Sequence, residues 1–195
     1  MNNLSQNIVG VDEVGRGCLF GPVFAGAVSL SKPAEDKLIA SGLKDSKQLT
    51  AKKRALLSPL IKEKAHTWGI GEASNKEIDL LGIRTATELA VVRALNKISI
   101  PIEILLVDGI LPIRIWSGEQ KTLIKGDCNC ACISAASVIA KEARDSLLKK
   151  ISKNFPGYEL ESNFGYGTKA HRDALRKLGI TKLHRETFLS KIINN

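Results

Sequence analysis

The stretch of sequence that decides the fold is IVGVDEVGRG, residues 8–17. Its apolar beginning is typical of a short strand buried in a sheet, and that strand delivers two adjacent carboxylates, Asp12 and Glu13. Two charges at the tip of a buried strand need a compensating partner, and a divalent cation is the usual one. The glycines that follow let a ligand approach the backbone, and Arg16 offers a guanidinium suited to phosphate. The stretch therefore predicts metal-assisted phosphate chemistry.

Two further predicted strands also end in an acid. Asp108 follows the apolar run 102–107, and Asp127 follows the shorter run 121–124. Strand ends of one sheet can converge although their residues lie far apart in the chain, and four carboxylates at one edge repel one another unless cations neutralise them. Oxygen-only ligands favour Mg²⁺ or Mn²⁺ over zinc. Two such ions about 4 Å apart would form the clamp used for in-line phosphodiester displacement.

Strand geometry limits how the first two acids can act together. Successive side chains of a strand point to opposite faces, so Asp12 and Glu13 cannot both face one site in a regular strand. Either the strand has begun to turn at Glu13, which the following Val-Gly-Arg-Gly favours, or Glu13 reaches the site from its edge. Each acid taken alone is typical of a turn or cap. Because acids follow three predicted strands in a basic chain, we favour a metal site over separate turn or cap residues.

Length and charge narrow the classes of partner. The 195 residues suffice for one full core, and 29 basic residues against 20 acidic ones give a net charge of +9. This surplus favours nucleic acid, because neutralising phosphates releases counterions. An anionic membrane surface is the competing partner, but no basic amphipathic helix stands out. With no apolar run of membrane-spanning length and no secretory signal, we expect a cytoplasmic protein without a membrane partner.

The four cysteines, Cys18, Cys128, Cys130 and Cys132, do not form a disulfide framework in a chain of this size. The C-x-C-x-C run could mark a metal or redox site. However, side chains would alternate along an extended segment, and no His or fourth Cys lies nearby at zinc spacing. We therefore expect a structural or incidental role for this run.

Hydrophobic periodicity predicts an α/β domain without repeats or long linkers. The predicted strands are Ile8–Val11, Val23–Leu30, Thr67–Ala73, Ile102–Val107 and Lys121–Ile124. The predicted helices are Thr50–Ala65, Asn75–Ile98, Ile133–Ile151, Lys169–Leu178 and Arg185–Ile193. Small residues at the start of the helix 133–151 indicate close packing against the sheet. We expect one domain over residues 1–195, in which residues from about 152 to 195 form a helical C-terminal extension.

Six blocks of this sequence occur in the order seen in type 2 ribonuclease H (ribonuclease HII). They are DEVGRG (12–17), DSKQL (45–49), VDG (107–109), KGD (125–127), ISAASVIAK (133–141) and GYGT (165–168). The resemblance spans roughly residues 8 to 190, nearly the whole chain. It implies a ribonuclease H-like fold, a mixed β-sheet flanked by helices, with a small helical C-terminal extension that binds substrate.

The resemblance also implies an activity. The family hydrolyses RNA within RNA–DNA duplexes, including DNA duplexes that contain single ribonucleotides, and cuts on the 5′ side of the ribonucleotide with Mg²⁺ or Mn²⁺. The expected products carry 3′-hydroxyl and 5′-phosphate ends. Two ions are expected during catalysis, one near Asp12 and Asp127 that activates a water, the other near Glu13 and Asp108 that stabilises the leaving oxygen. We further expect a monomer with a replication-associated protein partner.

Roles carry over to the residues that match the family's motifs. Asp12, Glu13, Asp108 and Asp127 match its four metal-binding carboxylates. The segment Gly15, Arg16 and Gly17 matches the motif that reads the ribonucleotide's 2′-hydroxyl and adjoining phosphate. Tyr166 matches the tyrosine that stacks under the ribose at the RNA-to-DNA junction. The chain departs from the family at residues 128–132, where a proline is common and three cysteines stand instead, so thiol oxidation beside Asp127 could perturb metal binding.

Several neighbouring residues are weaker candidates for phosphate contacts. Ser46 and Lys47 lie in a polar loop that suits a DNA phosphate, although a solvated helix-start loop explains them equally well. Lys125, two residues before Asp127, could contact the scissile or a neighbouring phosphate, or be a surface lysine. In the C-terminal part, His171, Arg172, His184 and Arg185 would add exposed or phosphate-facing donors.

Two rival functions remain open. Type 3 ribonuclease H needs runs of ribonucleotides but carries an additional N-terminal binding domain, for which a first motif at residue 8 leaves no room. A non-catalytic nucleic-acid-binding module of the same fold would have a degenerate active site, whereas all four acids are present.

Overall fold

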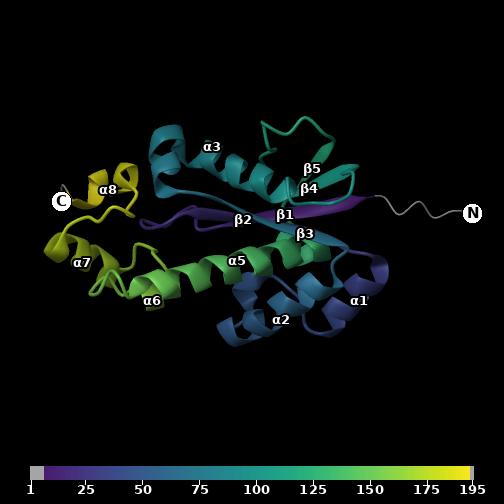
Figure 1. Ribbon diagram of the computed structural model, residues 1–195, viewed down its shortest axis with the longest axis horizontal. Coiled ribbons are helices and arrows are strands. Elements are labelled where there is room, and N and C mark those ends of the chain that lie inside the picture. Colours follow the sequence, from purple (N-terminus) through teal and green to yellow (C-terminus); the bar gives the residue numbers. More distant parts are fainter. Residues whose placement is uncertain (1–6, 194–195) are drawn as a thin grey trace, which may run out of the picture.

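The centre of the protein is a mixed five-stranded sheet, seen in a computed structural model that describes residues 7–193 (Figure 1). Its strands are β1 (Ile8–Val14), β2 (Val23–Ser29), β3 (Thr67–Ala73), β4 (Ile104–Asp108) and β5 (Gln120–Leu123). They lie in the order β3-β2-β1-β4-β5. β1 pairs antiparallel with β2 and parallel with β4, which confirms the expected mixed β-sheet.

β1 is longer than its apolar run predicts. Asp12 and Glu13 still pair with Gly26 and Ala25 of β2, so the strand does not end at Val11. The chain turns only at Gly15, whose φ of 88° suits glycine. Pairing with β2 therefore holds both acids in regular strand geometry, and their side chains point to opposite faces of the sheet.

Helices cover both faces of the sheet (Figure 1). α3 (Asn75–Leu95) lies on one face, while α5 (Ala131–Ser152) lies on the other, with α1 (Lys32–Ala40) and α2 (Ala51–Lys64) packed beyond it. Within residues 7–193 no helix has the length and apolarity needed to cross a membrane.

The close approach of α5 to the sheet depends on small residues on both sides. A Cβ at Gly10 of β1 would lie 2.6 Å from the backbone of Cys132, and one at Gly26 of β2 would clash with the carbonyl of Ala136. Ala135 and Ala136 are fully buried at this contact. The predicted tight packing of the helix start is confirmed, and it brings α5 beside Asp12.

Two helix predictions need correction. α3 is not one continuous helix, because Gly82 adopts φ 77° and ψ 154° and divides it. α1 was missed altogether, since its apolar positions are few and Pro33 stands in its first turn. By contrast, α2 begins as expected at Thr50, whose side chain accepts a hydrogen bond from the Lys53 amide.

The C-terminal part packs against the far end of α5, opposite the N-terminus in Figure 1. It contains α6 (Leu160–Asn163), α7 (Lys169–Leu178) and α8 (Glu186–Ile193). The bounds of α7 are those predicted. The expectation that His171, His184 and Arg185 are exposed donors is wrong: they are 0%, 1% and 0% exposed. They line the interior where this part meets the β1–β2 connection. There the two imidazoles contact each other, and Arg185 donates to backbone carbonyls through Nε and Nη1.

Candidate active site

Three of the four predicted acids converge where β1, β4 and the helix α5 meet. Asp12 comes from β1, Asp108 ends β4, and Asp127 lies in α4 (Gly126–Asn129), a single helical turn before α5. Each offers a carboxylate oxygen, and the three oxygens lie within 4.8 Å of one another. Asp127 thus reaches the site from a helical turn and not from a strand end, because β5 stops at Leu123 and the chain turns through Lys125 at φ 56°.

The environment of the three acids favours a bound cation. Burial and the charge of neighbouring Glu13 together raise the pKa of Asp12 to about 7. Burial and the charge of Asp127 likewise raise the pKa of Asp108. Carboxylates that are buried together bind protons or cations in place of solvent. The donor set contains only oxygen, which fits Mg²⁺ or Mn²⁺.

Glu13 does not join this cluster. Strand alternation turns its side chain to the α3 face of the sheet, where it forms an ion pair of 3.1 Å with Arg16. Glu13, Arg16 and Asp108 also line a pocket of about 200 Å³ beside the N-terminal part of the loop after β4. Asp108 therefore faces both the three-acid cluster and the pocket that contains Glu13.

The residues predicted to contact phosphate differ in how far they are exposed. The ammonium of Lys47 lies 3.1 Å from Asp127 Oδ2, and its side chain is 77% exposed. Ser46 is buried, and its hydroxyl lies 2.7 Å from that of Ser137 on α5, so it holds the loop in place and is not free for a phosphate. Lys125 is exposed at the turn before Asp127.

The residues predicted to recognise the ribonucleotide's sugar lie together although they are far apart in the sequence. Tyr166 forms a backbone bridge with Cys18, and the Leu19 amide donates to the carbonyl of Gly165 at 2.8 Å. The Tyr166 side chain stays 38% exposed beside the turn that begins at Gly15. The structure therefore brings Tyr166 next to the Gly-Arg-Gly segment, on the chain that leaves Asp12.

Two buried arginines fix this arrangement: Arg144, which the sequence analysis did not identify, and Arg185, which it expected to be exposed or phosphate-facing. Arg144 on α5 donates to the carbonyls of Phe20, Pro22 and Phe164 at 2.8–3.0 Å. Arg185 donates to the carbonyls of Gly21 and Arg16 at 2.9 and 2.8 Å. Both side chains are 0% exposed. A signal for Arg144 was present, since it occupies the same buried stripe of α5 as Ala140 and Leu148, four residues to either side.

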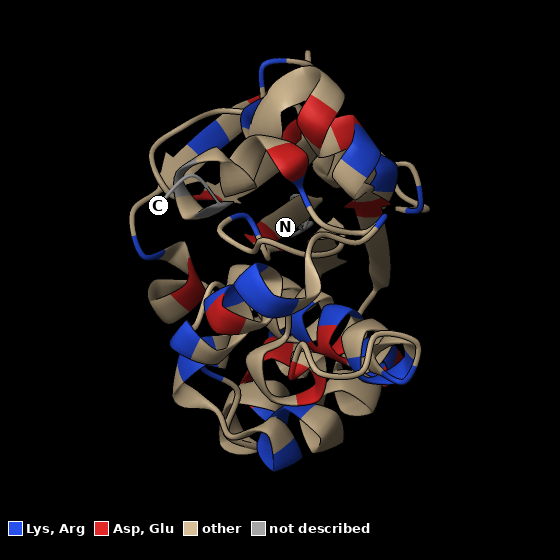
Figure 2. Ribbon diagram, turned by 90° about the vertical axis from the view of Figure 1, so that its left-hand side faces the viewer, with Lys and Arg blue, Asp and Glu red and all other residues tan. Residues whose placement is uncertain are grey.

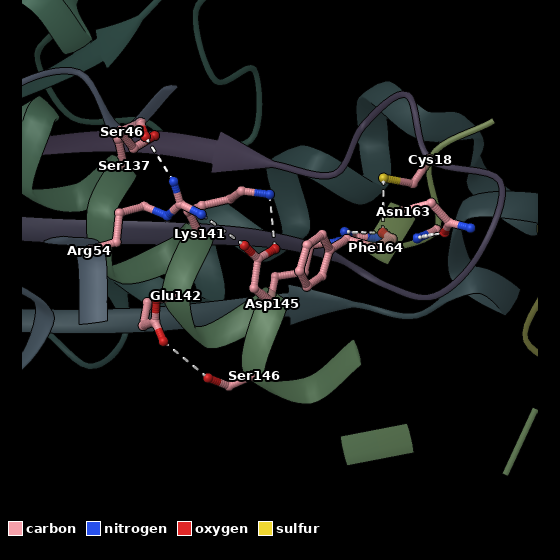
Figure 3. A network of polar contacts seen from close by, with 12 residues as sticks. Cys18, Ser46, Arg54, Ser137, Lys141, Glu142, Asp145, Ser146, Asn163 and Phe164 are labelled. Carbon is pink, nitrogen blue, oxygen red and sulfur yellow. Dashed lines mark hydrogen bonds and ion pairs between the residues drawn. The ribbon is translucent and has the colours of Figure 1, made fainter. Parts of the chain in front are cut away.

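A polar network along α5 joins the Ser46 loop to the Phe164 loop (Figure 3). Arg54 of α2 and Lys141 of α5 both contact the buried Asp145, at 3.3 and 2.9 Å. Lys141 Nζ also lies 5.2 Å from the centroid of the Phe164 ring and 5.6 Å from that of Tyr166. Cations of α5 therefore support the aromatic residues beside the site.

The cysteine run is not extended throughout as predicted, because it is helical on both sides of an extended Cys130. Cys128 lies in α4, Cys130 caps α5, and Cys132 lies in its first turn. The sulfur atoms of Cys130 and Cys132 are 3.2 Å apart. Hydrogen bonding between them lowers the pKa of Cys130 and raises that of Cys132.

We expect the metal-free protein to lose stability as the pH rises from 4 to 7. The pKa of Asp12 is raised from 3.8 to about 7, so the folded state binds this proton more tightly than the unfolded chain does. The contribution is fully present below pH 4 and is lost as the pH rises through 7. At about 1.4 kcal/mol per pKa unit, it reaches about 4 kcal/mol as an upper value. Saturating Mg²⁺ or Mn²⁺ at pH 7.5 should restore stability, because it binds only the folded state.

Urea denaturation at pH 5 and pH 7.5, with a chelator or with Mg²⁺, measures this effect. Asp12→Asn serves as the control, because it has no proton to lose and should flatten the pH dependence. An unchanged pH dependence in Asp12→Asn would show that other groups cause the loss.

Comparison with known proteins identifies the family of this chain. The family model for Ribonuclease HII matches residues 9–191. The chain is 56% identical over 192 residues to "Ribonuclease HII" of Prochlorococcus marinus (strain MIT 9313), covering 98% of this chain and 88% of that protein.

Solved structures agree as well. The fold matches the ribonuclease H2 of Pyrococcus horikoshii OT3 with a TM-score of 0.77 and 27% identity, over 96% of this chain and 97% of that one. It also matches the Archaeoglobus fulgidus RNase HII solved in a complex with PCNA, with a TM-score of 0.75 and 24% identity, over 95% and 96% of the two chains. This chain therefore belongs to the ribonuclease HII family, and its sheet has the ribonuclease H-like fold of that family.

Proposed function

We propose that this endoribonuclease hydrolyses RNA in RNA–DNA duplexes and cuts 5′ of single ribonucleotides embedded in DNA, leaving 3′-hydroxyl and 5′-phosphate ends. The observation that carries the proposal is the adjacency of two groups of residues. The carboxylates of Asp12, Asp108 and Asp127 converge within 4.8 Å, and the turn that directly follows β1 lies beside Tyr166.

The acids would hold two divalent ions, Mg²⁺ or Mn²⁺. When bound, such ions lower the pKa of a water and stabilise the leaving oxygen. Asp12 and Asp127 would hold one ion, and Asp108, which faces both the cluster and the pocket, would share the second with Glu13. Lys47, whose exposed side chain pairs with Asp127, would contact a phosphate of the substrate.

The Gly-Arg-Gly segment would read the sugar. The 2′-hydroxyl is the group by which a protein distinguishes RNA from DNA, and a backbone without side chains can approach it closely. A Cβ at Gly17 would meet no atom within 4 Å, so the backbone there is open on that side. Arg16 and Lys125, both exposed, would contact neighbouring phosphates. The exposed ring of Tyr166 would stack under the ribose at the junction.

The C-terminal region, residues from about 152 to 195, would bind the duplex as part of the same domain. α7 is strongly one-sided, with buried His171, Ala174 and Leu175 and exposed Lys169 and Arg176. Figure 2, which views the end of the molecule that carries α7 and α8, shows Lys and Arg positions among acidic ones on this face. The monomeric state, the replication-associated partner and the cytoplasmic location stay predictions.

A cleavage assay on three duplexes tests the proposal. With Mg²⁺ or Mn²⁺, all-DNA duplex should stay intact, DNA with one ribonucleotide should be cut once on its 5′ side, and an RNA–DNA hybrid should be cut along its length. Cleavage of the hybrid alone would instead favour the type 3 specificity. Binding without cleavage of any duplex would favour the non-catalytic module.

We expect Tyr166→Ala to reduce cleavage at a single ribonucleotide by roughly 10- to 100-fold in kcat/KM, because a misplaced sugar lowers the rate far more than it lowers affinity. Duplex affinity, which depends on phosphate contacts, should change by less than about threefold. Single-turnover cleavage and fluorescence anisotropy measure the two quantities. Trp68→Ala, at an exposed aromatic residue of β3, is the control. Equal losses in affinity and cleavage would contradict the assignment.

A further inference from the structure

A pair of buried histidines that the proposed chemistry does not use lies directly behind Tyr166. His171 in the first turn of α7 and His184 before α8 are 0% and 1% exposed, and their Nε2 atoms are 3.1 Å apart. His171 Nδ1 lies 3.0 Å from the carbonyl oxygen of Tyr166. At the other end, His184 Nδ1 lies 3.0 Å from the amide nitrogen of Thr181. The four groups form one continuous line of hydrogen bonds.

The direction of this line is fixed by its ends. The Tyr166 carbonyl can only accept, so His171 carries its proton on Nδ1 and its Nε2 accepts. His184 must therefore carry its proton on Nε2, which leaves its Nδ1 as an acceptor. The Thr181 amide can only donate, and it meets that acceptor. The Tyr166 carbonyl and the Thr181 amide therefore require the same pair of tautomers, and in this pair both imidazole rings are neutral.

The surroundings keep both rings neutral. Burial lowers the pKa of His171, and burial together with the nearby His171 lowers that of His184 to about 4. The other titratable group against the rings is Tyr158, whose hydroxyl donates to the Gly179 carbonyl. The guanidinium of Arg185 is directed to the carbonyls of Gly21 and Arg16.

The far end of the line is firmly anchored. Asn75, at the start of α3, donates to the carbonyl of His184 at 3.1 Å, and the backbone of His184 also bridges to Phe20. Phe20 follows the Gly-Arg-Gly segment in the same connection. The line of hydrogen bonds therefore connects the Tyr166 backbone to His184, whose own backbone is held by Asn75 and Phe20.

We propose that His171 and His184 are positioning residues that hold the Tyr166 backbone, and thereby the Tyr166 ring, in the place where it discriminates a single ribonucleotide from a run of them. The inference rests on the proposed role of Tyr166. It assigns no contact with substrate to either histidine.

Substitutions that remove or retain individual hydrogen-bonding groups of the line test this proposal. His171→Leu removes the donor to Tyr166 and should reduce kcat/KM at a single ribonucleotide by roughly 10- to 100-fold, while cleavage of an RNA–DNA hybrid changes by less than about threefold. His171→Asn retains a donor near the Nδ1 position and should recover most of the kcat/KM that His171→Leu loses. His66→Leu, at the exposed third histidine, should change neither activity.

A structural role alone would lower both activities together, and Asn would not rescue them; that result would overturn the proposal. If His171→Leu does not fold, His184→Leu and His171→Asn carry the same comparison. If Tyr166→Ala leaves the substrate ratio unchanged, the role of Tyr166 fails and this inference fails with it. If Tyr166→Ala alters the ratio and the histidine variants do not, only this inference fails.

The tautomers provide a readout that needs no substrate. Nitrogen-15 NMR of the imidazole rings should show the proton on Nδ1 of His171 and on Nε2 of His184 at pH 7. The opposite tautomer at either ring, or a charged ring, would break the line and contradict the proposal.

Discussion

Asp12→Asn and Asp108→Asn are each expected to lower cleavage of an embedded ribonucleotide by roughly three orders of magnitude or more. Metal ions contribute several kcal/mol of transition-state stabilisation, and each 1.36 kcal/mol corresponds to about tenfold in rate. Both acids belong to the three-oxygen cluster, and an amide in either place supplies one neutral ligand atom instead of a charged one. Weaker metal binding then removes the ion that the reaction requires.

Duplex binding should remain nearly intact in both variants. The proposed phosphate contacts come from exposed lysines and arginines, and removing a negative charge near the duplex would not weaken them. Single-turnover cleavage and anisotropy with a ribonucleotide-containing duplex, at saturating Mg²⁺ and again at saturating Mn²⁺, measure both quantities. Asp36→Asn is the matched control, because Asp36 is exposed on α1, where it pairs with Lys32. Retained turnover in both active-site variants would rule out the metal assignment.

The core of the fold could be predicted from the sequence because its signals are local. The apolar runs of β1, β2 and β4 and the small residues that start α5 are visible in the sequence, and both these strands and the close packing of α5 are confirmed. The length of β1 could not be predicted in this way. Its polar end stays in the sheet because β2, with Gly26 opposite Asp12, continues to pair with it. That pairing is a tertiary effect, and it decides which way Glu13 points.

The site was predicted by residue type, but its supporting residues were not. Acids at chain turns are conspicuous, whereas Ser46 looks like any loop serine until its contact with Ser137 is seen. His171 and His184 were expected in solvent because the sequence around them is basic. Their burial depends on carbonyl and imidazole partners that other segments bring. A sequence pattern shows that a side chain is polar, but it does not show whether another segment supplies a hydrogen-bond partner for it inside the protein.

Arg144→Met is expected to reduce the free energy of unfolding by about 3 kcal/mol. The guanidinium donates to the carbonyls of Phe20, Pro22 and Phe164, which belong to two separate connections. Hydrogen bonds from a charged donor contribute about 1.5–3 kcal/mol each, so the three together exceed the several kcal/mol that burying one charge costs. Methionine fills much of the volume but leaves these carbonyls without a donor.

Urea denaturation of the metal-free variants measures the loss. Lys150→Met, at an exposed position of α5, removes the same charge without a buried partner and should change stability by less than about 0.5 kcal/mol. Arg144→Lys keeps the charge but not the planar fork, so it should fall between the two. If Arg144→Met were no less stable than Lys150→Met, the carbonyls would have found other donors. In that case Arg144 would not join the turn after β1 to the Phe164 loop, and the adjacency of the three acids and Tyr166 would depend on backbone pairing and on Arg185.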